Sequence, residues 1–412
     1  MITIEIQNFS KKDFLFRSPR IIFGRGKISL LGEQSRYICE KDIKKELNAF
    51  LVTGKSSLKK SGNLEKILKN LNEANISVFI YDEIEGEPTT TVINYGKKLV
   101  IEQKSNIIIG IGGGSVMDSA KCISGLVTND GIVEDYHVGR RSFDKAGLPL
   151  ILAPTTSGTG SEVTNNGVVI DPTRGIKQSI RGDKMMAHVV ILDPELVLSC
   201  PKKYTTFSGA DALVQSIEAF VSKASNYLSD FFAIESIKLL LPSLPKVVND
   251  LLNIELREKM MLGSFIDGLA FATSKLGAVH GFAHPIGVKH NINHGLVCGL
   301  LLPYVMEYNA ELVYVQNKYA YIADIAVQSN IINEVDLKIK DCPDRIKDKA
   351  VWTIELIRKI FKHCEIPLHL KEIGITEDCI DDIVKDTKGS SLNNNPRDTD
   401  KESLKQILLN AL

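Results

Sequence analysis

The chain has 412 residues, more than one hydrophobic core usually covers, so two domains are expected. Its 50 basic and 50 acidic residues balance, and no basic stripe interleaved with aromatic residues is present, which argues against a nucleic-acid-binding protein. Its 7 cysteines are scattered singly without a CxxC pair, so neither a disulfide framework nor a cysteine-type zinc site is indicated. The amino terminus lacks a signal-peptide pattern and no run approaches the ~20 apolar residues of a membrane span, so a cytoplasmic protein is expected.

The first half of the chain alternates short β-branched runs with amphipathic stretches. This rhythm is typical of a parallel sheet with helices between its strands. Strands are predicted at residues 49–53, 77–81, 107–111 and 150–153, and helices at 64–74, 92–103 and 116–126. At the start of the chain, the alternating run Ile2 to Ile6 predicts a further strand, either paired across subunits or lying at a sheet edge.

From about Thr205 onward the strand signals stop and long helical periodicity replaces them. Helices are predicted at residues 228–240, 256–273, 312–326 and 350–364. Pro194 and Pro201 bracket a short apolar segment just before this change. We therefore predict an α/β domain over residues 1–204 and an all-α domain over residues 205–412.

Two glycine-rich loops follow predicted strands. Gly112-Gly113-Gly114-Ser115 lies between the strand at 107–111 and a predicted helix, and Pro-Thr-Thr-Ser-Gly-Thr-Gly-Ser-Glu occupies residues 154–162. Glycines let the backbone approach phosphate oxygens, and the first amides of a helix add the positive end of its dipole. No Gly-Lys-Ser/Thr follows, so neither is a Walker A loop. The pattern favours a diphosphate-binding site over turns that merely close a strand against a helix.

Four of the 8 histidines fall within residues 280–294, which is the strongest indication of chemistry in the chain. His280 and His284 are four apart and share a helix face, and His294 returns after a Pro/Gly-containing turn. Asp211 lies on an otherwise apolar helix, one turn before Gln215. A buried carboxylate needs a metal, an arginine or backbone donors, so these groups together favour a divalent metal site.

Five motifs in one order identify a family resemblance. They are Gly-Gly-Gly-Ser115-x-x-Asp118-x-Ala-Lys121, the loop at 154–162, Asp193-Pro194, Gly209-x-Asp211 and His280-Gly-x-Ala-His284-Pro. With them the chain resembles the iron-containing alcohol dehydrogenases over about residues 15 to 410. The resemblance implies a dehydroquinate synthase-like architecture, an α/β dinucleotide-binding domain plus an all-α domain. It also implies a nicotinamide cofactor, one divalent metal (Fe²⁺ or Zn²⁺), a small alcohol or aldehyde substrate and a homodimer.

The resemblance also implies cofactor residues. Those expected to line the diphosphate are Gly112, Gly113, Gly114 and Ser115. Those expected to contact the cofactor from elsewhere are Thr155, Thr156, Thr159, Asp118 and Lys177, although Lys177 could equally be a solvated lysine.

The metal ligands that the resemblance implies are Asp211, Gln215, His280 and His294. Gln215 departs from the family pattern, which has a histidine there. Amide oxygen is a weaker donor than imidazole. Three interpretations stay open: weak ligation by Gln215, a water-filled gap in a three-residue site, or loss of the metal. His284 would lie beside the nicotinamide and the substrate as a catalytic residue; the alternative is a structural histidine bonded to backbone.

Cofactor preference is predicted from the residues after the strand at 49–53. NAD-preferring relatives commonly carry an aspartate where Gly54 stands, and a carboxylate there would repel a 2′-phosphate. Gly54, Ser56 and Ser57 remove the repulsion and offer donors, so NADP(H) is favoured over NAD(H). If Lys55 and Lys59 are simply solvated, NAD remains open.

The predicted function is a metal-assisted, NAD(P)-dependent alcohol dehydrogenase or aldehyde reductase that transfers a hydride between a primary alcohol and nicotinamide. The aldehyde could be functionalised, for example sugar-derived or phosphonate-bearing. The alternatives are a lyase of the dehydroquinate-synthase type and a nucleotide-binding protein that has lost its metal.

Overall fold

A computed structural model describes residues 13–39 and 46–412, so the predicted strand Ile2 to Ile6 lies outside the described residues. The chain divides into two compact units. One runs from Arg17 to Cys200, and the other holds Pro201–Leu412 together with residues 13–16. The division between Cys200 and Pro201 falls close to residue 204, where the change of periodicity lies.

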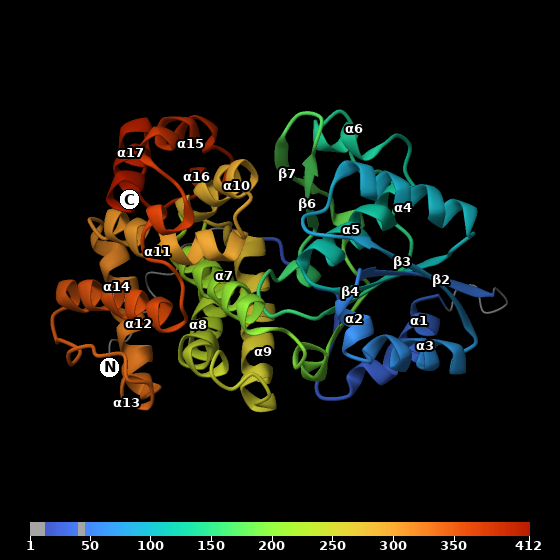
Figure 1. The fold of residues 1–412 in the computed structure, drawn as a ribbon, viewed down its shortest axis with the longest axis horizontal. Helices are drawn as coiled ribbons and strands as arrows, with labels where there is room; N and C mark the ends of the chain where they lie inside the picture. Colours follow the sequence, from blue (N-terminus) through green and yellow to red (C-terminus); the bar gives the residue numbers. More distant parts are fainter. Residues whose placement is uncertain (1–12, 40–45) are drawn as a thin grey trace. The chain divides into compact units, whose positions relative to one another are not determined.

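The first unit is built on a six-stranded parallel sheet of order β1-β8-β5-β4-β2-β3 (Figure 1). Its strands are β1 (Arg20–Phe23), β2 (Leu47–Gly54), β3 (Ile76–Ile84), β4 (Ile107–Gly112), β5 (Leu150–Pro154) and β8 (Val189–Leu192). Every residue of β4 and β5 is buried, as expected for central strands of a parallel sheet covered on both faces.

Helices connect these strands and cover the sheet. They are α1 (Leu31–Cys39), α2 (Ser57–Lys60), α3 (Asn63–Glu73), α4 (Thr90–Glu102), α5 (Gly114–Val127) and α6 (Val133–His137). Figure 1 shows α1 and α3 on one side of the sheet and α4 and α5 on the other. Helix α3 buries Leu64, Ile67 and Leu71, which are three and four residues apart, against the sheet core. The predicted βαβ rhythm is therefore confirmed.

Four strands were not predicted. The edge strand β1 and the strand β8 are only four residues long, too short for a clear pattern. An antiparallel pair, β6 (Asn166–Asp171) and β7 (Ile176–Arg181), forms a separate two-stranded sheet. Its polar residues resemble those of a loop in the sequence.

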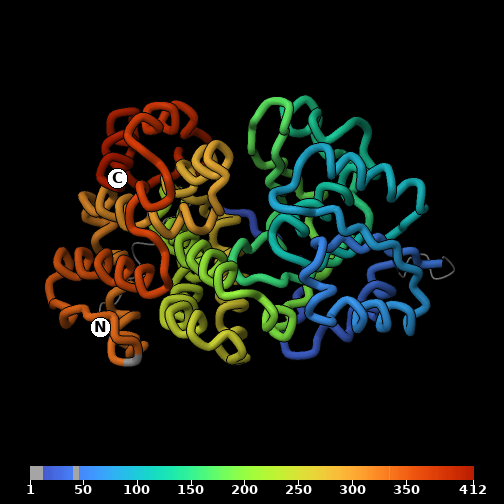
Figure 2. The backbone as a smooth tube through the Cα atoms, viewed as in Figure 1, coloured from blue at the N-terminus to red at the C-terminus, as the bar shows by residue number. Residues whose placement is uncertain are grey.

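The second unit contains only helices in its described residues, which confirms the predicted fold class. They are α7 (Lys202–Val221), α8 (Tyr227–Val247), α9 (Ile254–Ser274), α10 (Ala278–His290), α11 (His294–Asn309), α12 (Val313–Gln328), α13 (Ile331–Glu334), α14 (Ile346–His363), α15 (Ile380–Asp386), α16 (Ser390–Asn393) and α17 (Lys401–Asn410). Figure 2 traces them from α7 in green to α17 in red. Helix α7 is buried continuously from Gly209 to Val221, so its polar residues there are interior residues.

In the described part of the chain, no helix combines the length and apolar character needed to cross a membrane.

Candidate active site

Three predicted cofactor loops lie side by side on one edge of the sheet. They follow β5, β4 and β2, which are neighbours in the sheet, with Gly112 paired to Pro154 and Thr53 to Ile111. The strands are parallel, so all three loops leave from the carboxyl edge. This edge is where open α/β sheets bind ligands.

The first loop begins α5, with Gly113 as its N-cap residue and Gly114 as its first residue. A Cβ atom on Gly112 would lie 2.6 Å from the Cβ of Val116, and one on Gly114 would lie 2.7 Å from Cγ2 of Thr159. A side chain at Gly112 would therefore collide with the start of α5. A side chain at Gly114 would force the first loop away from the second. The amide of Thr155 donates to the carbonyl of Gly112 over 2.9 Å, so the two loops form one backbone surface.

Asp118 connects this surface to the segment beyond the second loop. Its Oδ1 accepts from the Ser161 hydroxyl over 2.5 Å and its Oδ2 from the Val168 amide over 2.9 Å. Lys121, fully buried, lies 3.0 Å from Asp118 and donates to the Ser161 carbonyl over 2.7 Å. Both residues hold the loops in place, and the sequence analysis did not predict this role. A direct contact of Asp118 with the cofactor stays a prediction.

The remaining predicted cofactor residues lie in the same unit. Thr156 lies 3.5 Å from a Cβ built on Gly113, whereas Ser56 and Ser57 are exposed at the start of α2. Gly54 ends β2 and has room for a side chain, because the nearest atom to its built Cβ is Oγ of Ser57 at 3.7 Å.

Lys177 lies on β7 with its side chain mostly buried. Its ammonium group pairs with Glu87 over 2.8 Å, so it is anchored at a defined position.

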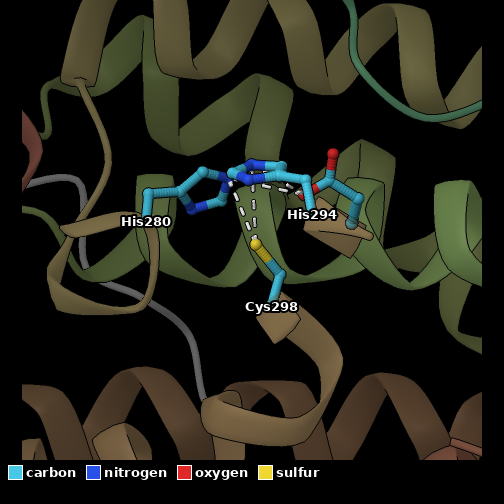
Figure 3. A group of neighbouring side chains, drawn as sticks. His280, His294 and Cys298 are labelled. Carbon is cyan, nitrogen blue, oxygen red and sulfur yellow. Dashed lines mark hydrogen bonds and ion pairs between the residues drawn. The ribbon is translucent and has the colours of Figure 1, made fainter. Parts of the chain in front are cut away.

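Side chains from three helices converge in the second unit (Figure 3). Asp211 comes from α7 and His280 from α10, and the two are linked by a 3.4 Å contact between Oδ1 and Nε2. His294, the first residue of α11, places its Nε2 3.9 Å from the same oxygen. These three predicted residues therefore form one cluster.

The chain reverses between His280 and His294 in a way that the sequence analysis did not predict. Pro285 and Gly287, expected in a turn, lie inside α10. The reversal is made by Asn291, which has a left-handed φ of 53°, and by Asn293, whose side chain accepts from the first amides of α11. Asparagine tolerates the left-handed region and caps helices well, which explains the difference.

Cys298 also belongs to the cluster, and the sequence analysis missed it. It lies one turn after His294 on α11, with its Sγ 3.7 Å from Nε2 of His294 and 3.9 Å from Nε2 of His280. One ligand atom from each of Asp211, His280, His294 and Cys298 falls within 4.8 Å of all the others. The His294-x-x-x-Cys298 spacing places both residues on one face of α11, but a single cysteine at this spacing is usually a core residue.

The cluster fits a bound cation. Asp211 and Gln215 are 3% and 4% exposed, yet Oδ1 of Asp211 and Oε1 of Gln215 accept no hydrogen bond from the described residues. Buried oxygens without donors are costly, and a cation would satisfy them. The Nε2 of Gln215 donates to Oδ2 of Asp211 over 3.0 Å.

Glu218 fixes the orientation of His280. Its Oε2 lies 2.6 Å from Nδ1 of His280, and its Oε1 accepts from the Val279 amide over 2.8 Å. Nδ1 of His280 therefore carries the proton and Nε2 faces the cluster, an arrangement typical of metal-binding histidines.

Charges in the cluster are strongly coupled. Burial opposes a charge on Asp211, but His294 and His280 outweigh it and hold the pKa of Asp211 below its usual value. Burial likewise opposes a charge on His280, but Cys298, Asp211 and Glu218 raise the pKa of His280 well above its usual value. Burial raises the pKa of the Cys298 thiol to about 12.

His284 lies one turn after His280 on α10 and is half-buried. Its ring centroid is 5.5 Å from that of His294. The predicted catalytic histidine is thus a neighbour of the cluster without being one of its four members.

Family comparison identifies the chain. Residues 18–194 match the model described as "Iron-containing alcohol dehydrogenase", and residues 205–412 match "Fe-containing alcohol dehydrogenase family, C-terminal". The chain belongs to the iron-containing alcohol dehydrogenase family. The predicted resemblance is confirmed, and the alcohol dehydrogenase activity of the family is favoured over the lyase alternative.

Individual relatives cover almost the whole chain. An NAD-dependent methanol dehydrogenase of Bacillus methanolicus is 31% identical over 398 residues, covering 96% of this chain and 99% of the relative. The solved structure of a 1,3-propanediol oxidoreductase has a TM-score of 0.88 at 29% identity, covering 97% and 100%. That of a sulfoacetaldehyde reductase from Bifidobacterium kashiwanohense in complex with NAD⁺ has a TM-score of 0.84 at 27% identity, covering 97% and 99%.

Membership in this family implies a nicotinamide cofactor and a divalent metal. The three sheet loops and the cluster around Asp211 are the groups in this alcohol dehydrogenase that fit them.

Proposed function

We propose that this alcohol dehydrogenase reversibly reduces a small aldehyde to a primary alcohol with NADP(H) and one divalent metal. The convergence of Asp211, His280 and His294 carries the proposal, because a buried carboxylate and two imidazoles are typical ligands of such a metal. A bound divalent cation would act as a Lewis acid toward the substrate oxygen.

The residues of the chain supply binding and orientation. Gly112, Gly113 and Gly114 offer backbone close enough for a diphosphate, with the amino end of α5 contributing its dipole. Glu218 keeps Nε2 of His280 directed to the metal position. In reduction, the aldehyde carbon accepts a hydride from the nicotinamide and its oxygen accepts a proton.

We assign the proton step to His284. It lies beside His294 and is not one of the four cluster members, and imidazole is the side chain that most often transfers protons in enzymes. A chain of waters along the cofactor ribose is the alternative path.

The preference for NADP(H) is supported by the surroundings of Gly54. No carboxylate stands at this position to repel a 2′-phosphate. Lys55 and Lys59 pair with Glu85 and Asp82 over 3.0 and 2.9 Å. Both pairs are partly exposed and therefore weak, so a phosphate could compete for the lysines.

Exchange of Gly54 tests this preference. Gly54→Asp is expected to lower the ratio of kcat/KM for NADPH to that for NADH by about tenfold or more, the size of one charged interaction. Gly54→Asn is the matched control, because it has the same shape without the charge. An unchanged ratio in Gly54→Asp, or a wild-type enzyme that prefers NADH, would remove the NADP(H) assignment.

The substrate class is the least constrained part of the proposal. Relatives are named for methanol, 1,3-propanediol and sulfoacetaldehyde, which are all small. We therefore expect short aliphatic aldehydes, with functionalised ones, such as sugar-derived or phosphonate-bearing aldehydes, as the next class.

Metal analysis combined with turnover tests the central claim. Purified enzyme is expected to hold one divalent metal per chain and to oxidise NADPH with short aldehydes, and chelation should abolish turnover. Turnover that survives complete removal of the metal would refute a metal-assisted reaction. Absence of both metal and turnover across the aldehyde panel would favour the nucleotide-binding alternative.

A homodimer is also proposed and can be checked by light scattering on the purified enzyme. The seven cysteines are spaced singly along the sequence, unlike those of a disulfide framework, which supports the predicted cytoplasmic location.

A further inference from the structure

The four atoms of the cluster have the spacing of a tetrahedral metal site. Zinc bonds of about 2.1 Å to nitrogen and oxygen and about 2.3 Å to sulfur give tetrahedron edges of about 3.4 to 3.6 Å. The distances from His280 to Asp211 and from His294 to Cys298 are 3.4 and 3.7 Å. Two further contacts, from His294 to Asp211 and from Cys298 to His280, are 3.9 Å each. All four ligand atoms lie within 4.8 Å of one another, so a metal would draw them closer together.

Cys298, rather than Gln215, supplies the fourth atom of this tetrahedron. Both are buried and both lie one turn after another member of the site, Gln215 after Asp211 on α7 and Cys298 after His294 on α11. However, the amide nitrogen of Gln215 is directed at Oδ2 of Asp211. A glutamine in this role orients the carboxylate, whereas the sulfur of Cys298 lies within 3.9 Å of both imidazoles.

The second indication is Oδ1 of Asp211, a buried oxygen that lacks a donor. Oδ1 of Asp211 is the atom that both imidazoles approach, and it accepts no hydrogen bond from the described residues. A metal held by Cys298 and the two imidazoles would lie against this oxygen.

We propose that Cys298 is a metal ligand in this enzyme, replacing the imidazole that the family pattern places at position 215, and that its sulfur makes the site prefer Zn²⁺ to Fe²⁺. The inference rests on the metal site of the proposed function and specifies its ligands. Gln215 is then a positioning residue for Asp211.

The chemistry of the donor atoms gives the direction of the preference. A thiolate is softer than an imidazole or a carboxylate, and tetrahedral sites with sulfur and nitrogen ligands favour zinc. On binding, the Cys298 thiol forms a bond to the metal and its proton is released to solvent. Four protein ligands would leave substrate oxygen to enter as a fifth, an expansion that zinc tolerates.

Cobalt(II) substitution tests the ligand directly in the full-length wild-type enzyme, without any turnover. Metal-free protein is titrated with Co²⁺ and its absorption spectrum is recorded. We expect visible bands of four-coordinate Co²⁺ together with a near-ultraviolet band from charge transfer between thiolate and cobalt. Cys298→Ser and Cys298→Ala should lose the near-ultraviolet band. Cys364→Ser, a buried cysteine of the same unit outside the cluster, should keep it.

The outcomes separate this inference from the proposed function. Visible bands without the charge-transfer band in wild type would exclude Cys298 as a ligand while leaving a metal site of other residues intact. No bands at all would refute the metal site and with it the ligand assignment. Because the deciding spectrum is that of wild type, a failure of the variants to fold does not affect it.

Metal competition and a rescue variant test the preference. The ratio of Zn²⁺ to Fe²⁺ binding constants should fall about tenfold in Cys298→Ser. Adding Gln215→His to Cys298→Ser should recover much of the zinc affinity without the charge-transfer band. An unchanged ratio in Cys298→Ser would overturn the claim that sulfur sets the metal choice.

Discussion

Glu218 shows how a single residue outside the ligand set can control the cluster. Its carboxylate bridges Nδ1 of His280 and the amide of Val279 within buried surroundings. Glu218→Gln would keep the shape but weaken the orienting bond, so metal affinity is expected to fall about 10- to 100-fold. Glu307→Gln, on the partly exposed end of α11, is the control. Equal zinc affinities of Glu218→Gln and wild type in a chelator competition would disprove this role.

The burial of Glu162, in the loop at 154–162, should make the free energy of unfolding depend on pH. Burial raises the pKa of its carboxyl to about 7. The folded state therefore holds a proton that the unfolded state has lost, so this group's contribution is fully present below about pH 4.5 and disappears as pH rises through about 7. The resulting loss in the free energy of unfolding is at most about 3 kcal/mol.

Glu162→Gln removes this titration. The variant should gain stability relative to wild type as pH rises from 5 to 8, measured by denaturant unfolding at each pH. A difference between the two proteins that does not change with pH would contradict the prediction.

At the scale of helices, the approach of α11 to α7 depends on Gly295. A Cβ atom there would overlap the carbonyl oxygen of Phe207 and lie 2.8 Å from its carbon, and 3.3 Å from Cβ of Asp211. Gly295→Ala would push α11 from α7 and separate His294 from Asp211. We expect a loss of about 1 to 3 kcal/mol in stability and a weaker metal site.

Gly281→Ala is the matched control on α10. Its Cβ would meet Leu392 at 3.4 Å, an ordinary contact, and alanine favours a helix by about 1 kcal/mol over glycine. Calorimetry and metal binding should therefore separate the two variants. Gly295→Ala with wild-type stability and zinc content would show that the helices can adjust.

Most helices and strands could be predicted from the spacing of their apolar residues. Each buries either one face or its whole length over many residues, and both kinds of burial leave a regular pattern. Helix α3 repeats its leucines and isoleucine at helical spacing, and β4 is a continuous apolar run. The hairpin β6–β7 and the asparagine reversal at Asn291 were missed. Their conformation depends on side-chain caps and on partners distant in sequence, which a local pattern does not report.

At the scale of the molecule, each ligand should protect its own unit. Zinc should slow amide exchange in α7, α10 and α11, which carry the cluster, while NADPH should slow it around Gly113 and Thr156. Hydrogen exchange followed by mass spectrometry measures both. Zinc protection confined to residues 17–200 would contradict the placement of the metal site.

Three of the four residues of the metal cluster could be predicted from the sequence. Asp211, His280 and His294 could be identified from the sequence. A carboxylate on an apolar helix and clustered imidazoles usually mark a functional site. Cys298 does not, since a lone buried cysteine is an ordinary core residue and only the packing of α11 on α7 and α10 brings its sulfur to the imidazoles. The sequence showed that Gln215 departs from the histidine of the family pattern. It did not show that Cys298 could replace that histidine as a ligand.

The order of these residues along the chain also bears on how the protein is made. The continuous sheet unit, residues 17–200, is synthesised in full before Asp211 is added, and Cys298 is the last member of the cluster to be added. A nascent chain would therefore have every glycine loop before it has a complete metal site. With the proposed ligand set, metal loading would be a late event in biosynthesis, and a chain truncated before residue 298 would hold zinc less tightly than the full chain.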